Sequence, residues 1–219
     1  METTYIEIDS PDKHLSDVLE EIPSNVILYK TLTGIGATYS EIKAQRHSII
    51  IEPNVPVIIG KCNSDKHKND NLLGVYEGVT TDRIIKYLGA SRGKYYKILT
   101  TPESFTKVKD AFLIFNGKIY NTCFLLIDEA HKTIKDVDYR RDIVLPMNDF
   151  FKFKGKALVS ATPLKFSDPR FEENGFSIIK IEPTYDYAKE IDIKPSTNIL
   201  REVWEEFGWM PFITGQGKD

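Results

Sequence analysis

The sequence alternates short apolar runs, rich in β-branched residues, with segments that have the spacing of amphipathic helices, and this rhythm restricts the fold more than any other feature. The runs predict strands at residues 25–30, 48–52, 72–76, 96–100, 123–127, 156–160 and 177–181. Helices are expected between them, at residues 38–46, 81–88, 103–115 and 142–151. Strands that alternate with helices pair in parallel through right-handed crossovers. We therefore predict an α/β fold, with a central, mostly parallel sheet and helices on both faces.

Composition excludes several classes of protein. The chain has 219 residues, 41% of them hydrophobic and 28% charged, so it can close a packed core and is not a disordered or fibrous chain. Its formal net charge of -3 is inconsistent with a surface that is positive throughout, so any contact with nucleic acid must use a local basic patch. Two cysteines, Cys62 and Cys123, cannot form a disulfide framework, which favours a reducing compartment.

No targeting signal is visible. The N-terminus, Met1 to Tyr5, is acidic where a signal peptide would be basic and then apolar. The longest apolar stretch, residues 48–60, is interrupted by Glu52 and by two prolines, well short of the ~20 apolar residues that a membrane helix needs. We therefore expect a cytoplasmic protein without a membrane partner.

The rhythm of strands and helices stops near residue 183, because residues 184–198 are polar and weakly patterned. We expect a domain at residues 1–183, followed by an exit segment or linker at residues 184–219. In open parallel sheets, ligands bind beyond the carboxyl ends of the strands. Four of these ends carry recognisable residues.

The first is a glycine turn between the strand at 25–30 and the helix at 38–46. Glycines there let successive backbone N–H groups point into one concavity, which suits a phosphate. A P-loop has lysine before its threonine, where this chain has Ala37. Lys30 and Lys43 are close enough in sequence to be considered as substitutes, although the default for both is a surface position. A glycine turn without a ligand is the alternative.

The second is a pair of carboxylates, Asp128 and Glu129, directly after the most hydrophobic strand. One acid at such a position can hold a magnesium ion, and the other can orient or deprotonate a water. A solvated turn is the less favoured alternative, because the pair follows a strand that is apolar on both faces and precedes Ala130-His131.

Hydroxyl groups mark the other two strand ends. Ser160-Ala161-Thr162 can hydrogen-bond neighbouring carboxylates or bases without steric demand. Thr100-Thr101-Pro102-Glu103 combines hydroxyls with a helix start, which could meet a nucleic-acid phosphate. An ordinary helix cap is an equally good interpretation of the second segment.

In their order and spacing, these segments resemble the first RecA-like domain of a superfamily 2 helicase of the DEAD/DEAH-box type, over roughly residues 20–185. The glycine turn is similar to the family's A-x-T-G-x-G-K-T with alanine for lysine, and Asp128-Glu129-Ala130-His131 is a DEAH box. Ser160-Ala161-Thr162 matches the family's coupling motif, and Thr100 to Glu103 resembles its T-x-P-E segment. Glu52-Pro53-Asn54 loosely matches another early nucleic-acid motif. The T-G-I-G-A-T loop also resembles helicase-like proteins of some bacteriophages.

The resemblance implies a RecA-like P-loop NTPase that binds ATP and Mg²⁺ and hydrolyses ATP to remodel DNA or RNA. The nucleotide would be bound by Thr33, Gly34, Ile35, Gly36, Ala37, Thr38 and Tyr39. Thr38 and Asp128 would share the magnesium ion, and Glu129, with Asp128 the catalytic pair, would position the attacking water. Coupling to nucleic acid would use Ser160, Thr162 and His131.

The resemblance also implies partners. Single- or double-stranded nucleic acid would be contacted by Thr100, Thr101, Pro102, Glu103, Pro53 and Asn54. A second RecA-like domain, on the full-length protein or on a partner chain, would complete the cleft. Because Ala37 removes an ammonium, hydrolysis would be weakened, and the alternative is a non-catalytic pseudo-ATPase that keeps the fold as a scaffold or regulatory module.

Two other groups invite interpretation. A basic cluster with interleaved tyrosines suits contact with a single strand, although an ordinary charged helix face explains it equally well; its members are Arg83, Lys86, Tyr87, Arg92, Lys94, Tyr95, Tyr96 and Lys97. Lys66-His67-Lys68 could contact phosphates, but a solvated hairpin or crossover loop is the favoured interpretation.

Overall fold

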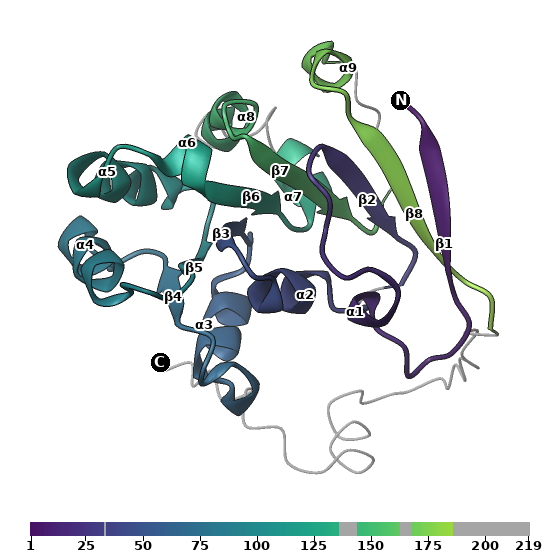
Figure 1. Cartoon of the computed structure of the whole chain (residues 1–219), viewed down its shortest axis with the longest axis horizontal. Helices are drawn as coiled ribbons and strands as arrows, with labels where there is room; N and C mark the ends of the chain where they lie inside the picture. Colours follow the sequence, from purple (N-terminus) through teal and green to yellow (C-terminus); the bar gives the residue numbers. More distant parts are fainter. Residues whose placement is uncertain (33, 136–143, 163–167, 186–219) are drawn as a thin grey trace, which may run out of the picture. The chain divides into compact units, whose positions relative to one another are not determined.

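The computed structural model describes residues 1–32, 34–135, 144–162 and 168–185, and within them eight strands form one parallel sheet (Figure 1). The strand order is β1-β8-β2-β7-β6-β3-β5-β4, with every neighbouring pair parallel. The strands are β1 (Thr3–Ile8), β2 (Val26–Lys30), β3 (His47–Ile51), β4 (Leu72–Val75), β5 (Lys97–Thr100), β6 (Cys123–Ile127), β7 (Gly155–Ser160) and β8 (Ser177–Pro183). The predicted α/β fold is confirmed, and each predicted strand is found.

Helices join the strands, as parallel pairing requires. They are α1 (Leu15–Val18), α2 (Ala37–Lys43), α3 (Val55–Asn63), α4 (Thr81–Ala90), α5 (Phe105–Phe115), α6 (Ile119–Thr122), α7 (Ala130–Lys135), α8 (Val144–Phe150) and α9 (Arg170–Glu173), with a 3₁₀ turn η1 (Asp65–His67). No helix among these described residues is long and apolar enough to cross a membrane.

The core consists of two layers, one on each face of the sheet. Successive strand residues face opposite layers, so that Ile49 and Ile51 of β3 join one cluster while Ile50 joins the other. The first cluster includes Phe105 and Phe112 of α5, and the second includes residues of α1, α2 and α3 (Figure 1). Because both faces are covered, the central strands are apolar on both sides, which explains the continuous apolar runs in the sequence.

Several elements were not predicted, among them β1 and α3. β1 pairs in parallel with β8 at the edge of the sheet, with Thr3 opposite Ile178, although no strand was expected there. Helix α3 begins at Val55, directly after β3 and with Pro56 in its first turn, a position where proline is tolerated because its missing N–H would be unpaired in any case. Of the predicted exit segment, residues 186–219 lie outside the described residues, as do residues 142 and 143 of the predicted helix at 142–151.

Lys97 is buried rather than part of a basic surface. Its ammonium donates to the main-chain oxygens of Glu41 and Ala44, both at 2.8 Å, and to the Ser48 hydroxyl at 3.0 Å. These carbonyls belong to the last turn of α2, where backbone oxygens have no partner within the helix. Lys97 therefore anchors α2, the helix that follows the glycine turn, and is not available to nucleic acid.

The buried position of Lys97 predicts a pH-dependent stability. Burial, the main cause, lowers the pKa of Lys97 to about 8 from its ordinary value of 10.5. Between about pH 8 and about pH 10 the unfolded chain therefore holds a proton at Lys97 that the folded chain has released, and raising the pH favours the folded state. We expect the unfolding free energy of the wild type, relative to Lys97→Met, to rise by about 1 kcal/mol per pH unit over this range. Urea denaturation of both proteins at several pH values measures the difference, and a flat or falling difference would contradict the assignment.

Candidate functional site

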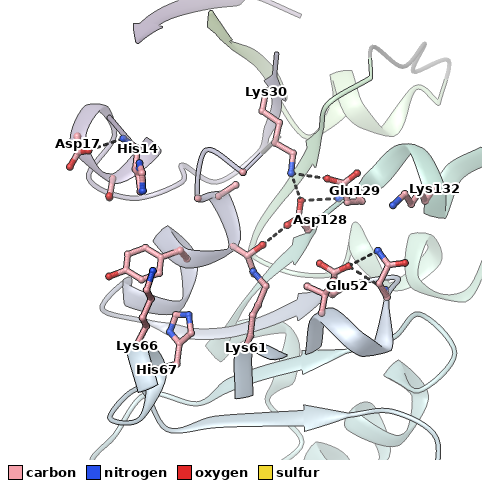
Figure 2. Close-up of a pocket in the computed structure, with 18 of the residues that line it drawn as sticks. His14, Asp17, Lys30, Glu52, Lys61, Lys66, His67, Asp128, Glu129 and Lys132 are labelled. Carbon is pink, nitrogen blue, oxygen red and sulfur yellow. Dashed lines mark hydrogen bonds and ion pairs between the residues drawn. The ribbon is translucent and has the colours of Figure 1, made fainter. Parts of the chain in front are cut away.

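A cavity of about 970 Å³ lies where the carboxyl ends of β2, β3 and β6 meet (Figure 2). This volume is in the range of sites that hold a small organic ligand. Its walls are polar and charged, and they come from the strand ends, the glycine turn, α3, η1, α7 and the segment around α1. The cavity is therefore at the position expected for a ligand of an open parallel sheet.

The glycine turn forms one wall. Gly34 and Gly36 have φ values of 82° and 90°, in the left-handed region that glycine adopts without steric cost. The turn is tied to the first residue of α1, because the Leu15 amide donates to the Ile35 carbonyl at 2.8 Å. Gly34, Gly36, Ala37, Thr38 and Tyr39 all line the cavity, and Thr33 lies outside the described residues.

Thr38 and Asp128 are brought into direct contact. The Thr38 hydroxyl donates to Oδ2 of Asp128, and both side chains are buried. The backbone of Asp128 is held by the neighbouring strand β3, because the Asp128 amide donates to the Ile51 carbonyl at 2.9 Å. Thr38, which follows the glycine turn, is therefore in contact with the carboxylate at the end of β6, although the two residues are 90 positions apart in the sequence.

Lys30, the last residue of β2, also reaches this carboxylate. Its ammonium lies 3.1 Å from Oδ1 of Asp128 and 2.8 Å from Oε1 of Glu129, and the residue is only 7% exposed. Burial lowers the pKa of Lys30, but the two carboxylates more than offset this, so that its pKa is raised above the ordinary value. The default expectation of a surface lysine is therefore wrong for Lys30. It holds for Lys43, which is partly exposed and pairs with Asp70 at 2.7 Å.

Glu129 has an unusual backbone. Its φ is 50°, a left-handed conformation that costs a residue with a Cβ about 1–2 kcal/mol. Its amide donates to Oδ1 of Asp128 at 2.8 Å, which helps to hold this conformation. Strained residues of this kind concentrate at functional sites.

A polar chain leads from Glu129 to the segment after β7. Nε2 of His131 lies 3.5 Å from Oε2 of Glu129, and Nδ1 lies 3.2 Å from the Ser160 hydroxyl. The Ser160 hydroxyl donates to the Thr162 carbonyl at 2.7 Å and accepts from the Thr162 amide. Because the single hydroxyl hydrogen of Ser160 goes to Thr162, Nδ1 of His131 is the donor in its contact with Ser160. The structure thus places His131 between the acid pair and Ser160-Ala161-Thr162.

Glu52 was not among the predicted site residues. It follows β3, lines the cavity, and accepts hydrogen bonds from the amide and the side chain of Asn54 at 3.2 and 3.3 Å. Burial and, to a lesser degree, the charge of Asp128 raise its pKa. Its position after a buried apolar strand, like that of Asp128, is the sequence signal that identifies it.

The residues predicted to contact nucleic acid lie in different surroundings. Thr100, Thr101 and Pro102 are buried; the Thr100 hydroxyl donates to the Thr101 carbonyl at 3.1 Å, and the Thr101 hydroxyl accepts from the Ser104 amide at 3.3 Å. Glu103 is exposed. On the other side of the site, Asn54 lines the cavity and Pro53 is partly exposed.

Several further residues line the cavity without having been predicted. His67 is the clearest: it is buried, its Nδ1 donates a hydrogen bond to the Asp70 carboxylate at 2.8 Å, and its ring lies 5.4 Å from that of Tyr39. The prediction of a solvated loop is therefore wrong at this residue. The others include Asp12, His14, Asp17, Lys61, Lys66 and Lys132.

The donor atoms fit a magnesium ion. Mg²⁺ prefers oxygen ligands and is usually held by one or two carboxylates together with substrate phosphates and water, rather than by an all-protein cage. Thr38 and Asp128 supply a hydroxyl and a carboxylate side by side. Among the described residues there is no group of three or more His, Cys, Asp or Glu side chains arranged as metal ligands.

The chain was compared with known proteins. No protein-family model matches the chain, and no curated protein does. Solved structures do: a hypothetical ATP-dependent RNA helicase from Sulfolobus tokodaii (TM-score 0.49, 16% identity) and a DEAD box protein from Methanococcus jannaschii (TM-score 0.46, 19% identity), each over 72% of this chain. At identities below 20%, these likenesses concern the fold alone.

The Hef helicase domain of Pyrococcus furiosus is similar over 75% of this chain, with a TM-score of 0.44 and 14% identity. These matches span 48%, 45% and 36% of the three helicase chains, so this chain corresponds to about half of their length or less.

Proposed function

We propose that the chain binds ATP with Mg²⁺ and hydrolyses it, as the nucleotide-binding half of a helicase-like motor that acts on nucleic acid. The contact between the Thr38 hydroxyl and the Asp128 carboxylate, at the rim of a glycine turn and beside Glu129, carries the proposal. A glycine turn offers amides to phosphates, and an adjacent hydroxyl and carboxylate offer oxygens to the accompanying metal.

Each residue of the site has a definite task in this proposal. Thr38 and Asp128 hold Mg²⁺, which when bound neutralises phosphate charge. Glu129 accepts a hydrogen bond from the attacking water and aligns it with the terminal phosphate. Its left-handed backbone and its amide bond to Asp128 keep the second acid in a fixed position relative to the first.

His131, Ser160 and Thr162 form the route by which the state of the nucleotide reaches other parts of the motor. The contacts between Glu129, His131 and Ser160 support this role, because a displacement of the Glu129 carboxylate changes its contact with the His131 imidazole. Residues 184–219 then lead towards a second RecA-like domain, in the same protein or on a partner. Glu103, Pro53 and Asn54 are the nucleic-acid contacts that reach the surface or the cavity.

Nucleic acid is expected to stimulate hydrolysis. ATP turnover by the chain is measured alone, with single-stranded DNA, with single-stranded RNA and with duplexes of each, and we expect at least one of them to raise the rate by about tenfold or more, since binding energy on the polymer can complete the catalytic arrangement. Equal rates with and without every polymer would contradict the nucleic-acid part of the proposal. Mg²⁺-ATP binding without any turnover would instead support the non-catalytic alternative.

A further inference from the structure

The glycine turn has no lysine, but the cavity beside it has several. In the described part of the chain, four lysines line the cavity: Lys30, Lys61, Lys66 and Lys132. Lys66 and Lys132 are exposed and Lys61 is half-buried, whereas Lys30 is buried. A lysine is rarely buried unless it is paired, so the position of Lys30 is one that the surrounding structure specifies.

Strand order explains how Lys30 reaches the acids. β2 and β6 are both neighbours of β7, and adjacent strands lie about 4.8 Å apart, so the tips of β2 and β6 are separated by about 10 Å. The Lys30 side chain extends from the end of β2 past the end of β7, and Figure 2 shows its ammonium pointing at Asp128 and Glu129. Lys43, at the other end of α2, turns instead to Asp70.

The two oxygens of Asp128 have different partners. Oδ2 accepts from Thr38, the proposed metal-side hydroxyl, and Oδ1 accepts from Lys30 at 3.1 Å. The Lys30 ammonium and the Thr38 hydroxyl thus contact the two different oxygens of one carboxylate. A phosphate offers an ammonium the same kind of acceptor, a charged oxygen that takes a short hydrogen bond.

We propose that Lys30 is the ammonium that contacts the terminal phosphate of the bound nucleotide, in place of the lysine absent at position 37. The inference rests on the proposed function, because it requires a nucleotide in the cavity. Without nucleotide, Lys30 pairs with both acids. With nucleotide, its Nζ exchanges Asp128 for phosphate oxygens, and this exchange leaves Asp128 open to the metal. ATP is then preferred over ADP, because ADP has no terminal phosphate for Lys30 to contact.

The test is nucleotide binding rather than turnover. Dissociation constants of a non-hydrolysable ATP analogue and of ADP, each with Mg²⁺, are measured by calorimetry for the wild type, Lys30→Met and Lys43→Met. We expect Lys30→Met to weaken binding of the analogue by about 10–100-fold and binding of ADP by less than about threefold, because a hydrogen bond between charged groups is lost only with the longer nucleotide. Lys43→Met should match the wild type.

Position 37 provides a second test, and its first part does not depend on the folding of Lys30→Met. Ala37→Lys in the wild-type background should change binding of the analogue by less than about threefold, since one ammonium already serves the phosphate. In the Lys30→Met background it should restore most of the lost affinity. A gain of tenfold or more from Ala37→Lys alone would show that the site lacks its ammonium and would overturn the inference.

The outcomes separate this inference from the proposed function. If the wild type binds neither nucleotide, the proposed function fails and the role of Lys30 fails with it. If the wild type binds and Lys30→Met binds equally well, only the role of Lys30 is wrong. A loss of analogue binding in Lys61→Met, without one in Lys30→Met, would likewise transfer the role to Lys61 and overturn the assignment.

Discussion

Replacing Glu129 by glutamine is expected to reduce ATP hydrolysis by about 10²–10⁴-fold, the usual contribution of a positioned acid or base. Glutamine keeps the size of the side chain but cannot accept a proton from water. The hydrogen bond from the backbone amide of residue 129 to the Asp128 carboxylate is unaffected, so binding of Mg²⁺-ATP should stay within about threefold of the wild type. Single-turnover hydrolysis, with protein in excess over radiolabelled ATP, measures the rate even when turnover is slow.

The control for this prediction is Glu172→Gln, which removes an exposed carboxylate of α9 outside the cavity lining. It should hydrolyse ATP at the wild-type rate. Hydrolysis by Glu129→Gln at the rate of this control would show that Glu129 is not the group that acts on the water, and the enzyme proposal would be lost with it.

Replacing Asp128 by asparagine is expected to abolish the dependence of ATP binding on Mg²⁺. Affinity for Mg²⁺-ATP should fall at least about 100-fold, since even the outer partners of metal ligands contribute about 10–100-fold. Wild-type affinity should drop when EDTA removes the metal, whereas the affinity of Asp128→Asn should be the same with and without EDTA. The variant is expected to fold, because Lys30 keeps its ion pair with Glu129.

Thr38→Val gives this experiment its matched comparison, since valine has the shape of threonine without the hydroxyl. It should weaken Mg²⁺-ATP binding in the same direction but less strongly, as it removes a neutral ligand rather than a charged one. Persistent Mg²⁺ dependence in Asp128→Asn would show that the metal is held elsewhere. Urea denaturation of both variants shows whether a lost affinity reflects a lost fold.

Much of the fold could be predicted because the central strands are covered on both faces. Runs such as Ile49 to Ile51 are apolar without alternation, which distinguishes them from the helices beside them. The glycine turn and the acid pair could be predicted for a related reason: both stand at the points where an apolar run stops, and parallel strands bring such points to one edge.

The edge strand and α3 were missed for local reasons. Thr3 to Ile8 mixes polar and apolar residues at the border of the sheet, where five of the six residues keep some exposure and no long apolar run forms. Val55 to Asn63 begins with a proline in an apolar stretch, a pattern shared by turns and buried strands. For β1, the partner strand β8 is also far away in the sequence.

The burial of Lys30 and Lys97 could not be predicted, because strand order is not a local property. Lys30 reaches Asp128 only because β2 and β6 flank the same strand, and Lys97 caps α2 only because β5 lies beside β3. A lysine at the end of an apolar run is expected at the surface unless the neighbouring strands are known. The buried carboxylate of Glu52 belongs to the same group, since its proximity to Asp128 follows from the pairing of β3 with β6.

The pairing of β1 with β8 has a consequence for how the protein is made. Thr3 lies opposite Ile178, so β1 is synthesised before every other strand of the described sheet and has no neighbour until almost all of that sheet has been made. At about 5–20 residues per second, this delay lasts ~10–35 s. During that time the segment must stay extended and unaggregated, and its glutamates and threonines suit it to do so. Pairing of β1 is therefore expected to be among the last steps in the assembly of this sheet during synthesis.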